Sequence, residues 1–323
     1  MKKKLISAIL AGVMTAALAA CGGGGSTTTT AAPAAEAPKT EAAAETKAEE
    51  TKAEETKAEE TKAEAKADVP EVTTFTPGKL TVGTSPDFAP YEFYHVGEDG
   101  TPTLAGFDMA FAAHIADKLG LELQVVPIDF DGILMELQNG NIDLGMAGFS
   151  PSPERAQVFD FSDIYYMGGQ SFCVRKADLE KYKDFADFKG LPVGAQNGSI
   201  QYELAQQNTP DANIIGLAKV TDIVSELLNG KLEGAFIETA VAEQYGKNYP
   251  DLVIAWGVPY DTEGSAIALQ KGNEALLNAV NGIIAEALSD GTLDQYVTEA
   301  MELASDEGNV YEGQLDENGQ IAK

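Results

Sequence analysis

The order of apolar segments after residue 75 is the feature that most constrains the fold of this chain. Short apolar strands alternate there with amphipathic helices, and Gly120 and the pair Asn139-Gly140 stand where two of these helices should end. Alternation of this kind predicts an α/β fold. The predicted strands cover residues 80–84, 123–127 and 142–147, and the predicted helices cover residues 108–119 and 131–138.

One unit of a helix followed by a strand occurs twice, ninety residues apart. Residues 133–148 read ILMELQNGNIDLGMAG, and residues 223–238 read IVSELLNGKLEGAFIE. Such a short unit can recur by chance, but together with the length of the chain it indicates two similar α/β lobes. Ligands of open α/β sheets bind beyond the carboxyl ends of the strands, so we expect the functional residues directly after these two strands.

The first twenty residues have the pattern of an export signal. Three lysines are followed by an apolar run at residues 5–20, which is shorter than the roughly 20 residues that a membrane-spanning helix needs. The small residues before Cys21 resemble the lipobox of bacterial lipoproteins, which implies cleavage before Cys21 and attachment of a lipid to its sulfur. An ordinary secretory signal with an incidental cysteine is the alternative.

Residues 21–74 then differ in composition from the rest of the chain. They are rich in Gly, Ser, Thr, Ala, Lys and Glu and include four copies of Glu-Thr-Lys-Ala-Glu at residues 45–64. A stretch with almost no large apolar residue cannot build a core. We predict a tether, either coil or partly helical, that holds the folded part away from a membrane.

Charge and metal-binding residue types exclude two classes of function. The chain has 51 acidic and 22 basic residues, a net charge of −29, which argues against nucleic acid as a partner because phosphate binding needs clustered Lys and Arg. Two cysteines and two histidines are too few for a Cys/His zinc site, and no metal or cofactor is expected. Cys173 is expected to be a buried strand residue.

The loop after residue 147 is the first candidate site. It runs from Gly148 through Ser150 to Arg155, and serine at a helix start leaves backbone N–H groups that can bind an anion. Arg155 is one of only two arginines in an acidic chain, which makes it a candidate for bidentate binding of a carboxylate. The alternative is an ion pair with Asp160 or Asp163.

Glu238 ends the equivalent strand in the second half. A carboxylate at the end of an apolar strand is costly to bury unless a cation compensates it, and an ammonium group would do so. Alternatively, Glu238 is an acid that the dipole of a following helix stabilises. Near the first strand, aromatic residues in the Pro-containing loop at residues 85–93 either sandwich the side chain of a ligand or cap the core.

Taken together, these segments resemble the extracellular solute-binding proteins of ABC importers, in particular the polar amino-acid-binding family. The resemblance covers about residues 77–302. It implies a type II periplasmic-binding-protein-like clamp, in which two lobes are joined by two crossing strands near residues 167–170 and 258–263. The segments that match in order are residues 85–93, 106–108, 129–134, 147–155, 160–166 and 194–201.

The composition of the chain and the resemblance together predict its organisation. A signal peptide (1–20) and a lipidated cysteine with its tether (21–74) precede lobe one (75–167 plus 263–308), lobe two (168–262) and an acidic tail (309–323). We expect a monomer at the outer face of the cell membrane, and the resemblance implies that it delivers a free amino acid to the membrane subunits of an ABC permease.

By the same resemblance, each charged end of an amino acid has its own residues. Arg155, assisted by Ser150, Gly148 and Ile200, would bind the carboxylate, and Glu238 would bind the ammonium group. The side-chain slot would be lined by Phe88, Phe130 and Ser85.

Two positions depart from the family pattern. Many relatives carry an acid or Asn where this chain has Ser85, and a hydroxyl residue is frequent where it has Ile200. These departures favour a neutral amino acid. No catalytic residue is expected, and His95, placed in a polar loop, and His114 are interpreted as structural or surface residues. A cleft enzyme of the same fold, dehydratase-like or lytic-transglycosylase-like, and a ligand-sensing module for a receptor are the alternatives.

Overall fold

The computed structural model of the protein describes residues 71–261, 264–305 and 310–311. The predicted signal peptide, Cys21, all but the last residues of the tether and most of the acidic tail lie outside the described residues. Among the residues that are described, no helix is long and apolar enough to cross a membrane.

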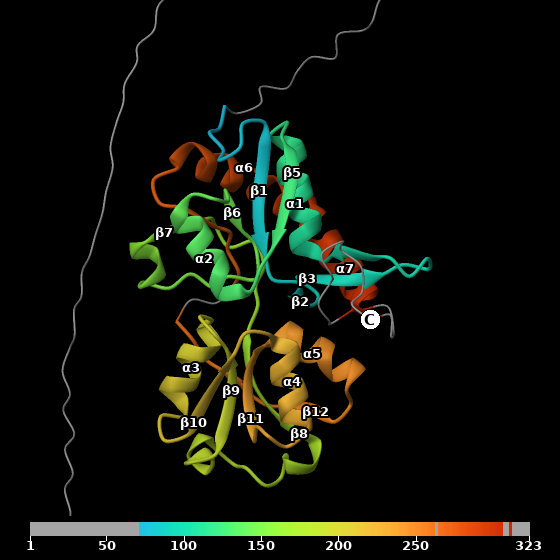
Figure 1. Ribbon diagram of the computed structural model, residues 1–323, viewed down its shortest axis with the longest axis vertical. Helices are drawn as coiled ribbons and strands as arrows, with labels where there is room; N and C mark the ends of the chain where they lie inside the picture. Colours follow the sequence, from blue (N-terminus) through green and yellow to red (C-terminus); the bar gives the residue numbers. More distant parts are fainter. Residues whose placement is uncertain (1–70, 262–263, 306–309, 312–323) are drawn as a thin grey trace, which may run out of the picture. The chain divides into compact units, whose positions relative to one another are not determined.

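A mixed five-stranded sheet forms the centre of lobe one (Figure 1). The strand β1 pairs in parallel with β5 and β6, and β13 runs antiparallel to both β6 and β7. In the order of the sheet the strands are β5 (Glu122–Pro127), β1 (Lys79–Thr84), β6 (Leu144–Gly145), β13 (Ala268–Gln270) and β7 (Phe159–Phe161).

Four helices surround this sheet. Helix α2 (Phe130–Asn139) lies against β1, β6 and β13, whereas α1 (Phe107–Lys118), α6 (Glu274–Asp290) and α7 (Thr292–Ala304) pack against one another. Helix α2 ends at Gly140, whose φ of 71° is the left-handed cap that the Asn-Gly pair predicts. A small sheet lies beside β1 and consists of β2 (Asp87–Phe88), β3 (Glu92–Val96), β4 (Pro102–Ala105) and β14 (Val310–Tyr311).

Lobe two has its own five-stranded sheet. Strands β10, β9 and β11 are parallel, and β8 and β12 continue the sheet in antiparallel pairs. The strands are β10 (Asn213–Leu217), β9 (Pro192–Gln196), β11 (Gly234–Glu238), β8 (Gln170–Arg175) and β12 (Leu252–Val258). The helices of this lobe are α3 (Ile200–Asn208), α4 (Val220–Leu228) and α5 (Thr239–Asn248).

The chain passes from one sheet to the other twice. It first passes between β7 and β8 and returns between β12 and β13, and an antiparallel bridge joins Tyr166 on the first passage to Ser265 on the second. Two α/β sheets joined by two passages agree with the predicted two-lobe fold. The lobe boundaries drawn from the sequence remain predictions.

One apolar cluster is shared by the two lobes. It contains Phe88 and Tyr91 from lobe one and Val220 and Tyr245 from lobe two, all buried. Cys173 is also in this cluster, fully buried in β8. Because apolar burial favours contact between the lobes, it also holds together the polar groups that lie among these side chains.

Local differences from the sequence predictions have simple causes. The strand expected at residues 142–147 is reduced to Leu144–Gly145, although the N–H groups of Asp143 and Met146 still bond to carbonyls of β1. The chain then turns out of the sheet at Gly148, where φ is 59°. His95 is not in a loop but in β3, where it pairs with Thr103 of β4.

Gly106 fixes the start of α1 against the segment that precedes β3. Its φ is 115°, and a Cβ added there would lie 2.0 Å from the carbonyl oxygen of Tyr91. That same oxygen accepts a hydrogen bond of 3.0 Å from the N–H of Asp108. The close approach therefore places Asp108 beside the loop at Gly148.

We expect Gly106→Ala to destabilise the protein strongly, because the substitution adds both an unfavourable φ and an unavoidable clash with backbone. Gly100→Ala is the matched control: its φ of 77° is also positive, but no atom lies within 4 Å of an added Cβ. Urea unfolding should show a loss of roughly 1 kcal/mol for Gly100→Ala and a clearly larger loss for Gly106→Ala. Equal losses would contradict this account of Gly106.

Candidate functional site

Arg155 is a buried guanidinium that forms no salt bridge among the described residues, although the charge of Glu203 acts on it. It begins a short 3-10 helix (Arg155–Gln157), and its side chain is 8% exposed. The Nη1 atom donates to the carbonyl of Ser150 at 2.8 Å, and Nη2 donates to the carbonyl of Gly198 in lobe two at 2.9 Å. Burial lowers the pKa of the guanidinium. Among the described residues it forms no ion pair. Asp160, one of the two acids considered as its alternative partner, pairs instead with Lys271 at 3.0 Å.

Ser150 and Gly148 differ in which of their hydrogen-bonding groups remain available to a ligand. Arg155 occupies the carbonyl of Ser150, and the hydroxyl of Ser150 has no partner among the described residues. The N–H of Gly148 donates to Oδ2 of Asp108 at 3.2 Å. Gly148 therefore offers a ligand its carbonyl oxygen, which accepts hydrogen bonds and suits an ammonium group rather than a carboxylate.

Ile200 is the first residue of α3. The side chain of Ser199 caps this helix by accepting from the N–H of Tyr202 at 3.2 Å. The first N–H groups of a helix have no acceptor within the helix, so the N–H of Ile200 is suited to bind an anion. Gly198, two residues earlier, contacts Arg155, so the start of α3 lies at the arginine.

Glu238 ends β11 and also begins α5. Its side chain is 2% exposed, Oε2 accepts from the N–H of Val241 at 2.9 Å, and Oε1 accepts from the N–H of Gly169 at 3.3 Å. Burial raises its pKa to about 7 against the effect of these hydrogen bonds. The helix-start interpretation of Glu238 is thus correct as a local description. The same carboxylate can also bind a ligand, because it is buried and has no cation beside it among the described residues.

The two aromatic candidates and Ser85 lie on lobe one. Phe88 is in β2, and its ring lies 2.8 Å from the position that a Cβ on Gly148 would take. Phe130 is the first residue of α2, with its ring centroid 4.7 Å from that of Phe149. Ser85 follows β1, is buried, and donates to Oδ1 of Asp87 at 2.9 Å.

Contacts therefore connect the candidates from the two lobes. Ile200 is two residues from Gly198, which contacts Arg155; Arg155 contacts Ser150, and the loop that holds Ser150 also holds Gly148 and touches Phe88. Cys21, the predicted lipidation site, lies outside the described residues.

Three residues that the sequence analysis did not single out also belong to this region. Oδ2 of Asp87 accepts from the N–H of Val220, the first residue of α4, at 2.6 Å, so lobe one caps a helix of lobe two. Asp108 accepts from the hydroxyl of Tyr165 at 2.6 Å. Burial raises the pKa of both aspartates to about 6. The third of these residues is Tyr91. In the sequence, all three were marked only as polar side chains within the matched segments.

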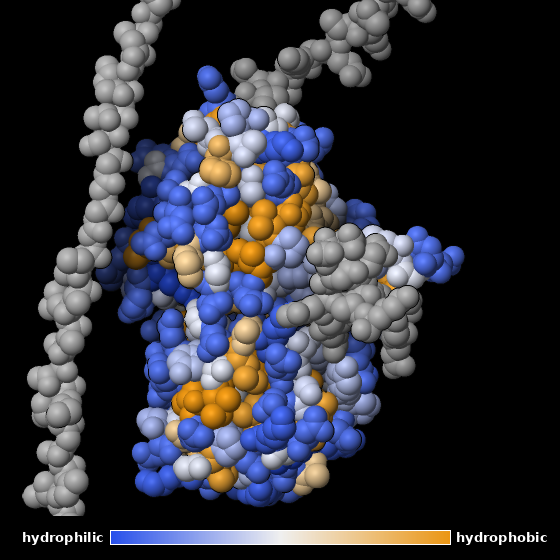
Figure 2. All heavy atoms as spheres, in the orientation of Figure 1, coloured by the Kyte–Doolittle hydropathy of each residue, from blue (hydrophilic) through white to orange (hydrophobic). Residues whose placement is uncertain are grey.

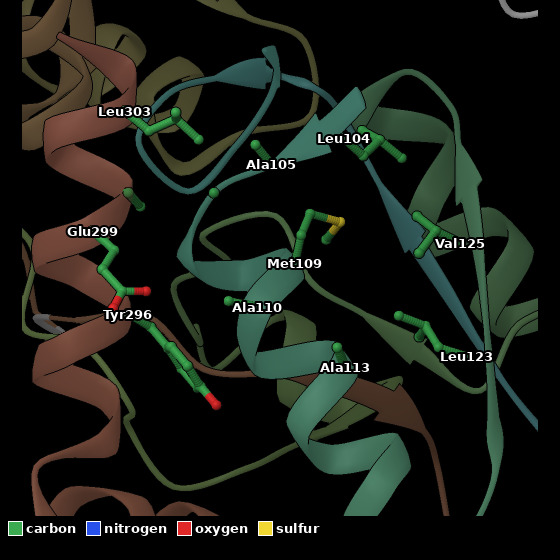
Figure 3. A pocket seen from close by; sticks show the side chains of 12 residues that line it. Leu104, Ala105, Met109, Ala110, Ala113, Leu123, Val125, Tyr296, Glu299 and Leu303 are labelled. Carbon is green, nitrogen blue, oxygen red and sulfur yellow. The ribbon is translucent and has the colours of Figure 1, made fainter. Parts of the chain in front are cut away.

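A separate groove of about 430 Å³ lies on lobe one (Figure 3). Side chains from β4, α1, β5 and α7 line it, among them Met109, Leu123 and Tyr296. Figure 2 shows apolar side chains gathered over β1, β5 and α1 on the face in view. Among the described residues that line this groove Glu299 is the one charged side chain, so they do not include paired charges like those of Arg155 and Glu238.

Metal ligands and histidines do not gather in the described part of the chain. No group of three or more His, Cys, Asp or Glu residues there is placed to hold a metal ion. The Nδ1 atom of His114 lies 3.2 Å from the hydroxyl of Tyr296, between α1 and α7. His95 lies between β4 and β14.

Comparison with known proteins gives consistent matches. A model of the family described as bacterial extracellular solute-binding proteins, family 3, matches residues 80–301. The chain is 33% identical over 222 residues to the arginine-binding extracellular protein ArtP of Bacillus subtilis (strain 168), a match that covers 67% of this chain and 84% of that protein.

Two solved structures extend the comparison to the fold. The amino acid ABC transporter substrate-binding protein AbpA from Streptococcus pneumoniae Canada MDR_19A, bound to L-arginine, has a TM-score of 0.69 and 34% identity over 71% of this chain and 97% of that chain. The ancestral amino acid-binding protein AncCDT-1, a precursor of cyclohexadienyl dehydratase, has a TM-score of 0.63 and 31% identity over 69% of this chain and 96% of that chain.

Glu92 generates a prediction about stability. It is fully buried in β3, and burial together with Asp108 and Asp87 raises its pKa well above the ordinary value of 4.5, against a smaller opposite effect of the Ser85 backbone. A carboxyl group with a raised folded-state pKa stabilises the fold fully below its unfolded pKa. That stability is lost as the pH rises toward the folded pKa, by about 1.4 kcal/mol per pH unit.

We therefore expect the free energy of unfolding to fall between about pH 4.5 and pH 7.5. Glu92→Gln should raise stability at about pH 7.5 and flatten this dependence, because the amide does not titrate. Glu122→Gln, at a side chain that is 69% exposed, is the control and should leave the dependence unchanged. Urea unfolding across this pH range measures both. A loss of stability at neutral pH for Glu92→Gln would show that the carboxyl is ionised in the fold.

Proposed function

This chain belongs to the bacterial extracellular solute-binding proteins of family 3, and we propose that it binds a free amino acid between its lobes and delivers it to an ABC-type import permease. The observation that carries the proposal is the pair of buried, oppositely charged side chains. Arg155 from lobe one and Glu238 from lobe two are each buried without an ionic partner among the described residues. A zwitterion would supply the missing charge to each.

The carboxylate of the ligand is assigned to Arg155. A guanidinium presents five N–H donors, and two carbonyl contacts leave three of them for a ligand. The hydroxyl of Ser150 and the N–H of Ile200 add neutral donors at the same place. Hydrogen bonds from these donors to the ligand carboxylate are charge-assisted. Bonds of this kind are roughly twice as strong as bonds between neutral groups, and burial strengthens them further.

The ammonium group is assigned to Glu238 and the carbonyl of Gly148. A pKa of about 7 means that Glu238 is only partly ionised at neutral pH. A bound ammonium group favours the ionised form, so binding would release protons near neutrality. This assignment moves Gly148 from the carboxylate to the ammonium end, because Asp108 occupies its N–H.

The side-chain slot is assigned to Phe88, Phe130 and Ser85, and the ligand to the neutral amino acids. Two aromatic rings and one hydroxyl provide no countercharge for a cationic side chain. The nearby carboxylate of Asp87 already accepts hydrogen bonds from Ser85 and Val220. Similarity to arginine-binding proteins supports a cationic ligand instead, and a ligand screen separates the two.

The protein acts outside the cytoplasm, as the family does. We further propose that Cys21 carries the lipid that anchors the chain to the outer face of the cell membrane, that residues 22–74 are the tether, and that the protein is a monomer. The pattern of small residues before Cys21 supports the anchor.

An enzyme is the second candidate, and two observations favour it. The pKa of Glu238, near 7, suits a general acid or base, and AncCDT-1 is a precursor of a dehydratase. We propose binding without catalysis, because the basic and acidic groups are arranged as for holding a zwitterion and because the related ArtP and AbpA are named as binding proteins.

We expect one or a few neutral amino acids to raise the melting temperature, by roughly 5 to 10 °C at a concentration 100-fold above the dissociation constant. Arg155→Ala should abolish the shift, because the buried carboxylate loses its countercharge. Arg175→Ala is the matched control: Arg175 pairs with Asp178 and Glu233 within lobe two, so its loss should lower stability but preserve the shift. Differential scanning fluorimetry with the twenty amino acids measures these shifts.

Three outcomes would contradict the proposal. No shift with any amino acid would exclude amino-acid binding, and a shift confined to arginine or lysine would exclude a neutral ligand. Turnover of a prephenate-like acid that disappears in Glu238→Gln would establish the enzyme instead.

The anchor is tested in the full chain. Wild-type protein should incorporate labelled palmitate and remain with the membrane fraction, whereas Cys21→Ser should be unlabelled and soluble. Cys173→Ser should keep the label, because Cys173 is buried in β8. Membrane retention of unlabelled Cys21→Ser would refute lipid anchoring.

A further inference from the structure

Tyr91 extends from lobe one to the place where both passages of the chain and the acid of lobe two meet. Its ring is fully buried, with the centroid 4.4 Å from that of Phe107 and 5.4 Å from that of Tyr166. Its hydroxyl accepts a hydrogen bond of 3.3 Å from Ser265 on the second passage.

Gly168, on the first passage, shows how close the hydroxyl of Tyr91 lies to Glu238. A Cβ added to Gly168 would be 2.9 Å from the Tyr91 hydroxyl oxygen and 2.7 Å from Oε1 of Glu238. Proximity of this hydroxyl lowers the pKa of the Glu238 carboxyl and so opposes the effect of burial. The missing side chain at Gly168 leaves the space in which the two groups meet.

We propose that Tyr91 is a positioning residue for ligand binding: its hydroxyl, which meets the Glu238 carboxylate at Gly168, orients that carboxylate toward the ammonium group of the ligand while lobe one lies against lobe two. The proposal rests on the proposed function, because it acts through the ammonium-binding role of Glu238. The N–H groups of Val241 and Gly169 donate to the Glu238 carboxylate from lobe two and the passage that leads into it, and the N–H of Ala240 also lowers its pKa. Tyr91 brings a hydroxyl to the same carboxylate from lobe one.

The groups around Glu238 favour this role. The titratable side chains that face it are Tyr91 and Tyr166, and burial together with nearby carboxylates raises the pKa of both, to about 12 for Tyr166. Both phenols therefore remain protonated at neutral pH. The acids Asp108 and Glu243 act on Tyr91 and Tyr166 respectively and add to the cost of charge in this region. A hydrogen bond from Tyr91 offsets part of that cost.

The decisive variant is Tyr91→Phe, which keeps the ring contacts and removes only the hydroxyl. Loss of a hydrogen bond to a charged group should raise the pKa of Glu238 by about one unit. Amino-acid affinity should then fall roughly fivefold at about pH 7 and roughly tenfold at about pH 5.5, and should match wild type to within about twofold at about pH 8.5. Replacing an inert packing residue would not change the pH profile.

Tyr166→Phe is the matched control. It removes the hydroxyl of a neighbouring ring, and no described hydrogen bond joins that hydroxyl to Glu238. Its pH profile should follow wild type. Gly168→Ala is a second variant, because its methyl group must push Tyr91 and Glu238 apart, and it should shift the profile in the same direction as Tyr91→Phe.

Binding is measured on the full chain by equilibrium dialysis against a radiolabelled equimolar mixture of the twenty L-amino acids, across this pH range. Wild-type protein that binds nothing refutes the proposed function and this inference with it. Wild-type binding with an unchanged pH profile in Tyr91→Phe overturns the inference alone. So does an equal shift in Tyr166→Phe, or a wild-type profile in Gly168→Ala.

Discussion

The burial of charge between two sheets is the constraint on which this molecule depends. Arg155 and Glu238 are almost fully buried, although an ion placed in a protein interior is costly unless it is paired. Backbone groups compensate part of this cost: carbonyls for the arginine, N–H groups for the glutamate. A ligand that carries two opposite charges would offset the part of the burial cost that the backbone groups do not. The site is therefore the place where two buried charges are only partly compensated by the protein.

The acidic side chains of lobe one show the same principle without a ligand. Asp108 ties α1 to the loop at Gly148, and Asp87 caps α4 across the two lobes. Glu92 is fully buried, and its burial favours the neutral carboxyl. Burial raises the pKa of all three carboxyls, and Asp108 and Asp87 raise that of Glu92 further. These groups therefore keep protons at a pH at which exposed acids would lose them. Ligand binding, contact between the lobes and protonation are therefore expected to be linked.

Much of the fold could be predicted because the local signals were strong. Strand β1, helix α1 and the left-handed end of α2 at Gly140 follow from apolar periodicity and from the chemistry of glycine. The prediction for β6 was too long because the pairing of its ends is irregular and the chain turns away at Gly148. His95 was misplaced because the strand β3 depends on partners, β4 and β14, that are distant from it in sequence or carry weak signals. Arg155, Glu238 and Phe88 were chosen from their positions after strands, and their roles remain proposals.

The sequence by itself determined the α/β alternation, the change of composition near residue 75, the scarcity of arginine and the order of motifs that identifies the family. These properties are local or compositional, so no knowledge of distant contacts was required. Only the tertiary structure decided that Asp108 occupies the N–H of Gly148, that Asp87 caps a helix of the other lobe, and that Tyr91 and Glu238 meet at Gly168. Each of these depends on which groups the fold brings close together across 40 or more positions of sequence, and on the burial that makes such a contact matter.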